Sequence, residues 1–170
     1  MKSNFSQNYL SIHLGRAGVD EITLGISSDY SGSQRKSQLY VNEKSLAVDV
    51  ERFWKSIKTK KLIILSVGFG EEDYYSNETD MYDTPVVSMR RGLKKARIGA
   101  NSHGCIPKEW SFDMSCRFKD TTTITPILEV VKQALGSYLS EKDEKAFRKA
   151  VKPFLQKKDR YVNFSLEEDY

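Results

Sequence analysis

The stretch that decides the fold is Trp110-Ser111-Phe112-Asp113-Met114-Ser115-Cys116-Arg117-Phe118. Large apolar side chains alternate with polar ones along its whole length, which is the period of a β-strand. One face of such a strand packs against a core while the other meets water, as in an antiparallel sheet that is covered on one side. We therefore predict a sheet with one covered face, and we place Cys116 in the core as a small apolar residue.

Shorter segments with the same alternation extend this sheet. Residues 10–14 and 22–26 alternate between apolar and polar side chains, and the turn-forming stretch 15–20 between them predicts a hairpin. The apolar run at residues 62–67 predicts a buried strand. Residues 39–41 predict a short strand, residues 27–37 a loop, and residues 162–166 a last strand that rejoins the sheet.

Three helices are predicted by apolar residues that recur three or four positions apart, within residues 50–57, 127–138 and 147–155. In the second helix, Pro126 suits the first helical position, where its missing N–H is not needed. In the third helix, Ser140 and Asp143 resemble a capping box at the start, and Pro153 should kink or end the helix. The predicted N-cap residues are Ser45, Thr125 and Ser140.

Together these patterns predict an α+β fold in a single domain, residues 1–170, with a mainly antiparallel sheet packed against helices, including a C-terminal helical pair. A chain of 170 residues with 39% hydrophobic and 29% charged residues suits an ordinary globular protein. No apolar window approaches the roughly 18 to 20 residues of a membrane-spanning helix. The N-terminus lacks the apolar core of a signal peptide, so we expect a cytoplasmic protein without a membrane partner.

Few chemical groups in the sequence point to an active site. Two cysteines cannot make a disulfide framework, and two histidines leave little material for a metal site. His13 occupies a polar position of its strand, where a surface or cross-strand histidine is expected. Glycine-rich phosphate loops are absent. We therefore predict a protein that is not an enzyme, with no catalytic residue, no metal and no cofactor; the oligomeric state is not indicated.

The strongest sign of function is an acidic and aromatic segment at residues 71–83. It contains six carboxylates and three tyrosines but no lysine or arginine, although the chain has a formal net charge of +4. Tyrosine is enriched in interfaces because its ring buries area at low entropic cost. Carboxylates around such rings suit a positively charged partner, whereas the simpler interpretation is a solvated acidic loop. The predicted binding residues are Glu71, Glu72, Asp73, Tyr74, Tyr75, Glu78, Asp80, Tyr82 and Asp83.

A basic stretch follows at residues 90–97, which hold Arg90, Arg91, Lys94, Lys95 and Arg97 and no acid. These cations suit phosphates, which makes a small nucleic-acid-binding protein the alternative function. Aromatic residues are not interleaved with them, however, and single-strand binders stack bases on rings. We therefore expect either a solvated face or an internal partner for the acidic segment, and we do not expect nucleic acid as the partner.

The string Ser102-His103-Gly104-Cys105-Ile106 resembles the cysteine signature of the L,D-transpeptidases. A cysteine nucleophile needs a thiolate, which a neighbouring imidazole favours by lowering the pKa of the thiol. Pro107 stands where that family has a substrate-binding Arg or Asn, and Thr84-Pro85-Val86-Val87 replaces its upstream histidine. We therefore expect a glycine-containing turn with an incidental thiol, and a cysteine enzyme at Cys105 is the least favoured function.

The stretch Tyr9–Asp29, YLSIHLGRAGVDEITLGISSD, and the later Phe53-Trp54-Lys55-Ser56-Ile57 resemble immunity proteins of bacterial contact-dependent growth inhibition systems. The resemblance covers about the first third of the chain and implies a cytoplasmic, non-catalytic protein. Its implied partner is the C-terminal toxin domain of its own system, commonly a nuclease such as a tRNase, whose active site or substrate surface it covers. Acidic residues 71–83 fit that role, since carboxylates can occupy a phosphate-binding surface in place of nucleic acid. The net charge of +4 departs from the acidic balance common in nuclease inhibitors.

Overall fold

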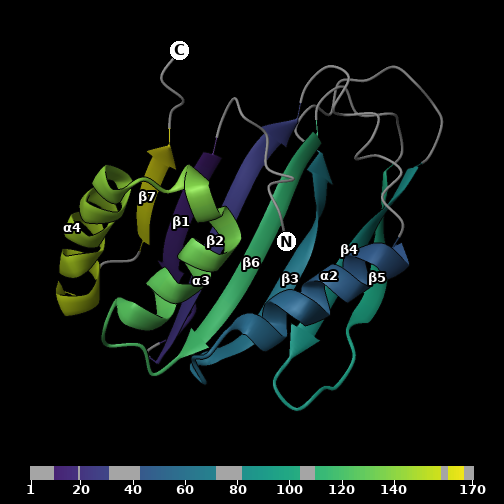
Figure 1. Ribbon diagram of the computed structural model, residues 1–170, viewed down its shortest axis with the longest axis horizontal. Coiled ribbons are helices and arrows are strands. Elements are labelled where there is room, and N and C mark those ends of the chain that lie inside the picture. The colour runs from purple at the N-terminus through teal and green to yellow at the C-terminus, as the bar shows by residue number, and fades with distance from the viewer. Residues whose placement is uncertain are drawn as a thin grey trace.

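The structure, a computed structural model, describes residues 10–18, 20–30, 43–71, 82–103, 110–157 and 161–166. It has an α+β fold in which seven strands form one antiparallel sheet and three α-helices of the described residues lie against it (Figure 1). The predicted fold class is therefore confirmed.

The strands follow one another across the sheet in the order β5-β4-β3-β6-β2-β1-β7. Their bounds are β1 Leu10–Arg16, β2 Glu21–Tyr30, β3 Leu62–Glu71, β4 Tyr82–Arg90, β5 Arg97–His103, β6 Trp110–Lys119 and β7 Tyr161–Leu166. The helices are α2 Glu43–Ser56, α3 Thr125–Leu135 and α4 Glu141–Lys157, with a 3-10 turn, η1, at Gly136–Tyr138.

Strand β6 lies at the centre of the sheet, between β2 and β3. Its residues Met114, Cys116 and Phe118 are buried, whereas the two polar residues between them are exposed. Cys116 pairs in register with Leu24 of β2 on one side and with Leu65 of β3 on the other, and both leucines are buried. The alternation in the sequence therefore marks the covered and the uncovered face of the sheet.

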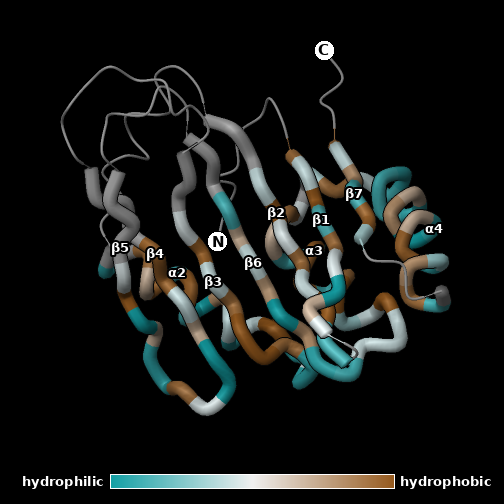
Figure 2. Tube along the Cα trace, turned by 180° about the vertical axis from the view of Figure 1, so that it is seen from behind, coloured by the Kyte–Doolittle hydropathy of each residue, from teal (hydrophilic) through white to brown (hydrophobic). Residues whose placement is uncertain are grey.

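All three helices lie on the same face of the sheet (Figure 1). Helix α2 packs on β4 and β5 at one side of the sheet, and α4 packs against β7 at the other. Figure 2 shows the sheet from behind, and no helix among the described residues covers this second face, which we call the open face. One hydrophobic core fills the space between sheet and helices, and its largest fully buried side chains are Phe118, Phe147 and Phe154.

Several local predictions are confirmed. Strands β1 and β2 form the predicted hairpin, and β7 rejoins the sheet beside β1. The capping box of α4 is present, because the Asp143 N–H donates to Ser140 Oγ at 3.1 Å and the Ser140 N–H donates to Asp143 Oδ2 at 3.3 Å. Helices α3 and α4 are the predicted C-terminal pair, and Lys132 of α3 binds Glu144 of α4 at 2.9 Å. None of the helices in the described ranges is long and apolar enough to cross a membrane.

The predicted N-caps Ser45 and Thr125 were wrong, and so was the start of the predicted loop at residues 27–37. Strand β2 continues to Tyr30, so residues 27–30 are strand, because they pair with β6. Helix α2 already includes Glu43, so Ser45 lies inside the helix. The N-cap of α3 is Ile124, without a side-chain hydrogen bond, and Thr125 and Pro126 follow it inside the helix. The predicted strand 39–41 and the rest of the predicted loop lie outside the described residues.

Helix α4 does not end at Pro153 but continues to Lys157. A proline inside a helix leaves the carbonyl four residues before it without its usual donor. That residue, Lys149, is exposed, as Pro153 is, so water can bind the carbonyl. The position of Pro153 on the solvent side of the helix therefore reduces the free-energy cost of placing a proline inside it.

Strands β4 and β5 were not predicted from the sequence. In β4, buried apolar side chains are limited to Val87 and Met89 among the residues whose side chains are described. Strand β5 contributes Ile98, which pairs with Val87 but is itself partly exposed. Strand β4 pairs with β3, β5 pairs with β4, and α2 packs on both strands. The pattern of a single segment does not reveal such contacts.

Replacing Phe147 by alanine should lower the free energy of unfolding by about 3–5 kcal/mol, the usual range for deleting a buried phenylalanine. Phe147 of α4 is 0% exposed, and its ring meets Phe164 of β7 edge to face with centroids 5.6 Å apart. Urea unfolding measures the change. Lys145→Ala, on the exposed side of the same helix, is the matched control and should shift the free energy by less than about 0.5 kcal/mol. Equal effects of the two changes would contradict this packing of α4.

Cys116 should resist alkylation in the folded protein, because burial encloses the thiol and raises its pKa. A Cys105→Ser background leaves Cys116 as the remaining cysteine of the chain. Mass spectrometry should find this protein unmodified by iodoacetamide when folded and fully modified in concentrated guanidinium. Fast modification of the folded protein would show that Cys116 is not part of a closed core.

Candidate functional site

The open face of the sheet is polar and built mostly from small side chains. Strand register places one residue of each strand on the same row across this face. Serine and glycine dominate the two central rows, so this part of the face is flat and hydrophilic. From β7 to β5, one row is Asn163, His13, Gly25, Ser115, Ser66, Ser88 and Arg97, and the next is Ser165, Ser11, Ser27, Asp113, Gly68, Val86 and Gly99.

Three side chains of these rows form a hydrogen-bonded chain. His13 Nδ1 lies 2.8 Å from Asn163 Oδ1, and His13 Nε2 lies 3.0 Å from Ser11 Oγ. An amide oxygen only accepts hydrogen bonds, so Nδ1 carries the hydrogen, and Nε2 of the neutral ring accepts the bond from the Ser11 hydroxyl. The structure thus gives His13 two partners, one of them 150 residues away in the sequence.

The order hydroxyl, imidazole and amide is also that of a nucleophile, its base and an orienting group in acyl transfer. Two features of the structure argue against that chemistry. Ser11 is only 3% exposed. Strand β1 lies between β2 and β7, so ladders on both sides engage the N–H groups of its described residues, and these are not available to stabilise an oxyanion. The two hydrogen bonds therefore serve to hold the His13 imidazole in one orientation.

The fixed imidazole lies along the sheet. Its Nδ1 is bonded toward β7, and its Nε2 is bonded to Ser11, two residues away on the same strand. The Cδ2 edge faces Gly25 on β2, where a Cβ atom would lie 3.7 Å from it. The two hydrogen bonds hold the ring, Gly25 has no side chain to cover its Cδ2 edge, and His13 remains exposed. The exposed ring is thus held in a fixed orientation.

One end of the open face is basic. Arg90, Arg97 and Arg117 are exposed and point away from the core, since Met89 of β4 and Phe118 of β6 alternate with them and are buried. Arg117 has Glu21 as a neighbour, with 3.6 Å between Nε and Oε2. The three arginines come from three strands, so their proximity on one face depends on the sheet order.

The turn between β4 and β5 adds Arg91, Lys94 and Lys95, all exposed, to the same end. Arg91 is partly engaged in the fold, because its guanidinium lies 5.8 Å from the centre of the Trp54 ring and donates to the carbonyl oxygen of Leu62 at 2.6 Å. The predicted basic stretch is therefore a solvated surface in which Arg91 has a structural contact and the lysines extend into water.

The ends of the acidic segment lie at the opposite end of the sheet. Glu71 is the last residue of β3 and pairs in register with Trp110, and Tyr82 is the first residue of β4 and pairs with His103. Asp83 follows in β4. Among the predicted binding residues, the structure describes the backbone of these three; Glu72, Asp73, Tyr74, Tyr75, Glu78 and Asp80 lie outside the described residues, as does Cys105. Strand β4 is nine residues long, so about 26 Å separates Tyr82 from Arg90.

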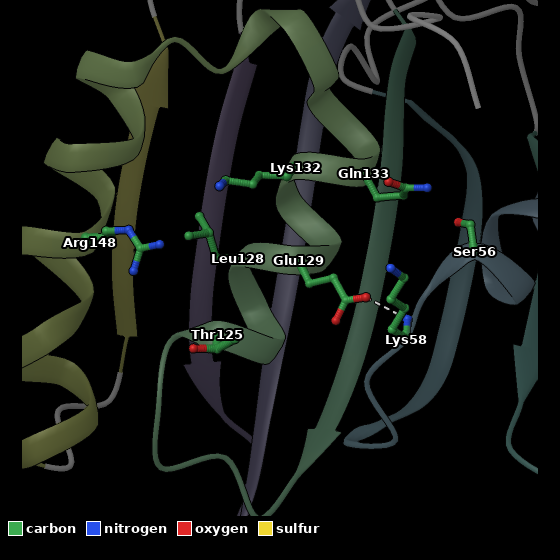
Figure 3. A pocket seen from close by; sticks show the side chains of 8 residues that line it. All are labelled: Ser56, Lys58, Thr125, Leu128, Glu129, Lys132, Gln133 and Arg148. Atoms are coloured by element: carbon green, nitrogen blue, oxygen red, sulfur yellow. Dashed lines mark hydrogen bonds between the residues drawn. The ribbon is translucent and has the colours of Figure 1, made fainter.

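A hollow of about 510 Å³ lies over α3, but its lining does not converge on one point (Figure 3). Lys132 and Leu128 point to one side of the helix, toward Arg148 of α4, whereas Glu129 and Gln133 point to the other side. Lys132 and Arg148 are both bound to Glu144, whose pKa their hydrogen bonds and charges lower, Lys132 having the larger effect. The Lys58 N–H donates to Glu129 Oε1 at 2.6 Å. These groups satisfy one another and do not form a ligand site.

The sequence therefore revealed the acidic and the basic segment, but not the hydrogen bonds of His13 with Ser11 and Asn163. The signal for Ser11 was present, since it occupies the same polar face of the strand as His13 two positions away. No signal pointed to Asn163, because only the pairing of β1 with β7 brings it beside the ring. Among the residues that the structure describes, no three His, Cys, Asp or Glu side chains gather as metal ligands.

The ring of His13 should be in the Nδ1–H form when it is neutral. This form follows from the acceptor Asn163 Oδ1 at Nδ1 and is the less common one for a free imidazole, so it reports the contact directly. Long-range proton–nitrogen NMR correlation at alkaline pH identifies the protonated nitrogen, and His103→Gln leaves His13 as the one remaining histidine. In Asn163→Leu the Nδ1–H preference should be lost. A neutral ring protonated at Nε2 in the protein with Asn163 intact would disprove the hydrogen-bond chain.

Comparison of the chain with protein-family models, with curated proteins and with solved structures found no match, so the fold and its contacts carry the functional argument.

Proposed function

We propose that this protein is a non-catalytic immunity protein that binds a toxin domain, a nuclease such as a tRNase, and blocks its active site or substrate surface. The resemblance of residues 9–29 and 53–57 to immunity proteins of contact-dependent growth inhibition systems motivates the proposal. Residues 71–83 are the proposed binding segment. The protein acts in the cytoplasm, where such a toxin arrives.

The observation that carries the proposal is where the acidic segment is attached. Its two ends belong to β3 and β4, which are adjacent strands of the sheet. Strand β3 is an interior strand with Leu65 and Val67 fully buried, so it is a firm support. Binding residues on such a support lose less freedom on association than residues on an unsupported chain.

The separation of the charges gives the docking a direction. The acidic segment starts at one end of the sheet, and the cations of residues 90–97 lie at the other. A nuclease surface that binds phosphates is rich in lysine and arginine, and it would be attracted to the first end and repelled by the second. Long-range attraction of this kind mainly raises the association rate, while buried rings such as Tyr74, Tyr75 and Tyr82 supply the binding energy.

Charge reversal of the acidic segment tests this function. Glu71, Glu72 and Asp73 are changed to lysine together, and association with the C-terminal domain of the secreted protein encoded directly upstream is measured by surface plasmon resonance. The association rate constant should fall about tenfold or more at low salt, and less at high salt, because salt screens exposed charges. The protein should also lose its ability to protect cells that produce the toxin domain.

A matched control changes three other acids to lysine, namely Asp20, Asp49 and Glu141. It alters the net charge by the same amount, and none of its residues belongs to the acidic segment. The control should keep the association rate within about twofold, which separates local attraction from total charge. An equal loss in the control would remove residues 71–83 from the interface, and absence of any complex between the intact proteins would overturn the proposed function.

A further inference from the structure

The open face carries two exposed aromatic side chains on neighbouring strands, His13 of β1 and Tyr161 of β7. Tyr161 is 69% exposed, and it pairs in register with Gly15, two residues from His13 on β1. Tyr161 and His13 are therefore diagonal neighbours on one face of an antiparallel pair, with Cβ atoms about 7 Å apart. Glycines stand beside both, Gly15 next to Tyr161 and Gly25 next to His13, so no side chain from these positions covers the rings.

Cations continue the row that begins with Tyr161. From β7 to β4 this row is Tyr161, Gly15, Thr23, Arg117, Ile64 and Arg90. At about 4.8 Å per strand, Arg117 lies about 14 Å from Tyr161, and Arg90 about 10 Å further on. Lys119 of the same face is also exposed and opposes Glu21. Rings at one side and guanidinium groups at the other thus share one flat surface.

Small hydroxyl side chains fill the space between rings and cations. Ser115, Ser66 and Ser88 lie on the His13 row, and Thr23 lies between Gly15 and Arg117. Hydroxyl groups are too short to obstruct an extended chain that lies across the sheet. The serine hydroxyls can donate to and accept from a ribose 2′-hydroxyl, whereas Thr23 Oγ1 donates to the Gly15 carbonyl oxygen at 3.2 Å and can only accept.

We propose that the open face binds single-stranded RNA, with bases stacked on His13 and Tyr161 and phosphates at Arg117 and Arg90. Stacking needs unpaired bases, because a duplex hides their faces, and an exposed sheet with rings and cations is a surface that single strands use. The fixed ring of His13 adds to this fit, since the Ser11 and Asn163 bonds hold it ready for stacking. This surface is separate from the acidic segment, so the inference stands or falls independently of the proposed immunity function.

Fluorescence anisotropy with a fluorescein-labelled 15-nucleotide oligouridylate tests the inference at about 50 mM salt. Tyr161→Ala should weaken binding about tenfold, as expected for the loss of one stacked base, whereas Tyr161→Phe should keep it within about twofold. Arg117→Ala should weaken binding and reduce the dependence of log affinity on log salt by about one unit. The oligodeoxyuridylate of the same length and a duplex RNA should both bind more weakly.

Lys149→Ala provides the matched control, because Lys149 is an exposed cation of α4, which lies on the other side of the sheet. It should leave the affinity unchanged. A readout on the unmodified protein is the NMR signal of the His13 ring protons, which should move upfield when oligouridylate is added, as a stacked base shields them. Circular dichroism confirms that each variant is folded.

Four results would overturn the inference. They are no binding of oligouridylate by the intact protein, equal binding of the deoxy strand, the same loss of affinity in Lys149→Ala as in Arg117→Ala, and His13 ring signals that do not move at saturating oligouridylate.

Discussion

The structure depends on burying one face, and one face alone, of a seven-stranded sheet. Strand β6 sets this constraint, because Cys116 sits between Leu24 and Leu65 and each neighbour must align its own apolar residues on the same side. A slip of β6 by one residue would bring Arg117 into the core and Cys116 into water. Register is therefore fixed across the sheet, and the covering of one face by α2, α3 and α4 follows from it.

The same constraint decides what the open face can display. His13 lies beside Gly25 and Asn163 because Leu14 has to lie beside Leu24 and Val162 on the covered side. The hydrogen-bond chain through the imidazole is thus a consequence of the core. The placement of charge has the same origin, since the antiparallel order puts both ends of the acidic segment at one end of the sheet and the turn with Lys94 and Lys95 at the other.

Sequence patterns predicted the parts of this molecule that repeat over many residues. The alternation of β6, the hairpin of β1 and β2, and the capping box of Ser140 and Asp143 each need only neighbouring residues to be recognised. Strands β4 and β5 escaped because their stability comes from pairing and from α2. The passage of α4 through Pro153 was missed because the proline lies on the solvent side of the helix, where water can bind the carbonyl that it leaves without a donor. For the site, the sequence revealed the acidic and basic segments, but the contact between His13 and Asn163 exists only through the pairing of the first and last strands.

That pairing has a consequence for how the chain reaches its native state. Among the described strands β1 is synthesised first, yet one of its two partners, β7, is synthesised last. Contacts between segments so far apart in the sequence form slowly, so completion of the sheet should be limited by the arrival of β7. Until then β1 is an unpaired edge of the kind that invites association with other chains. The nascent protein is thus most vulnerable to aggregation just before β7 leaves the ribosome.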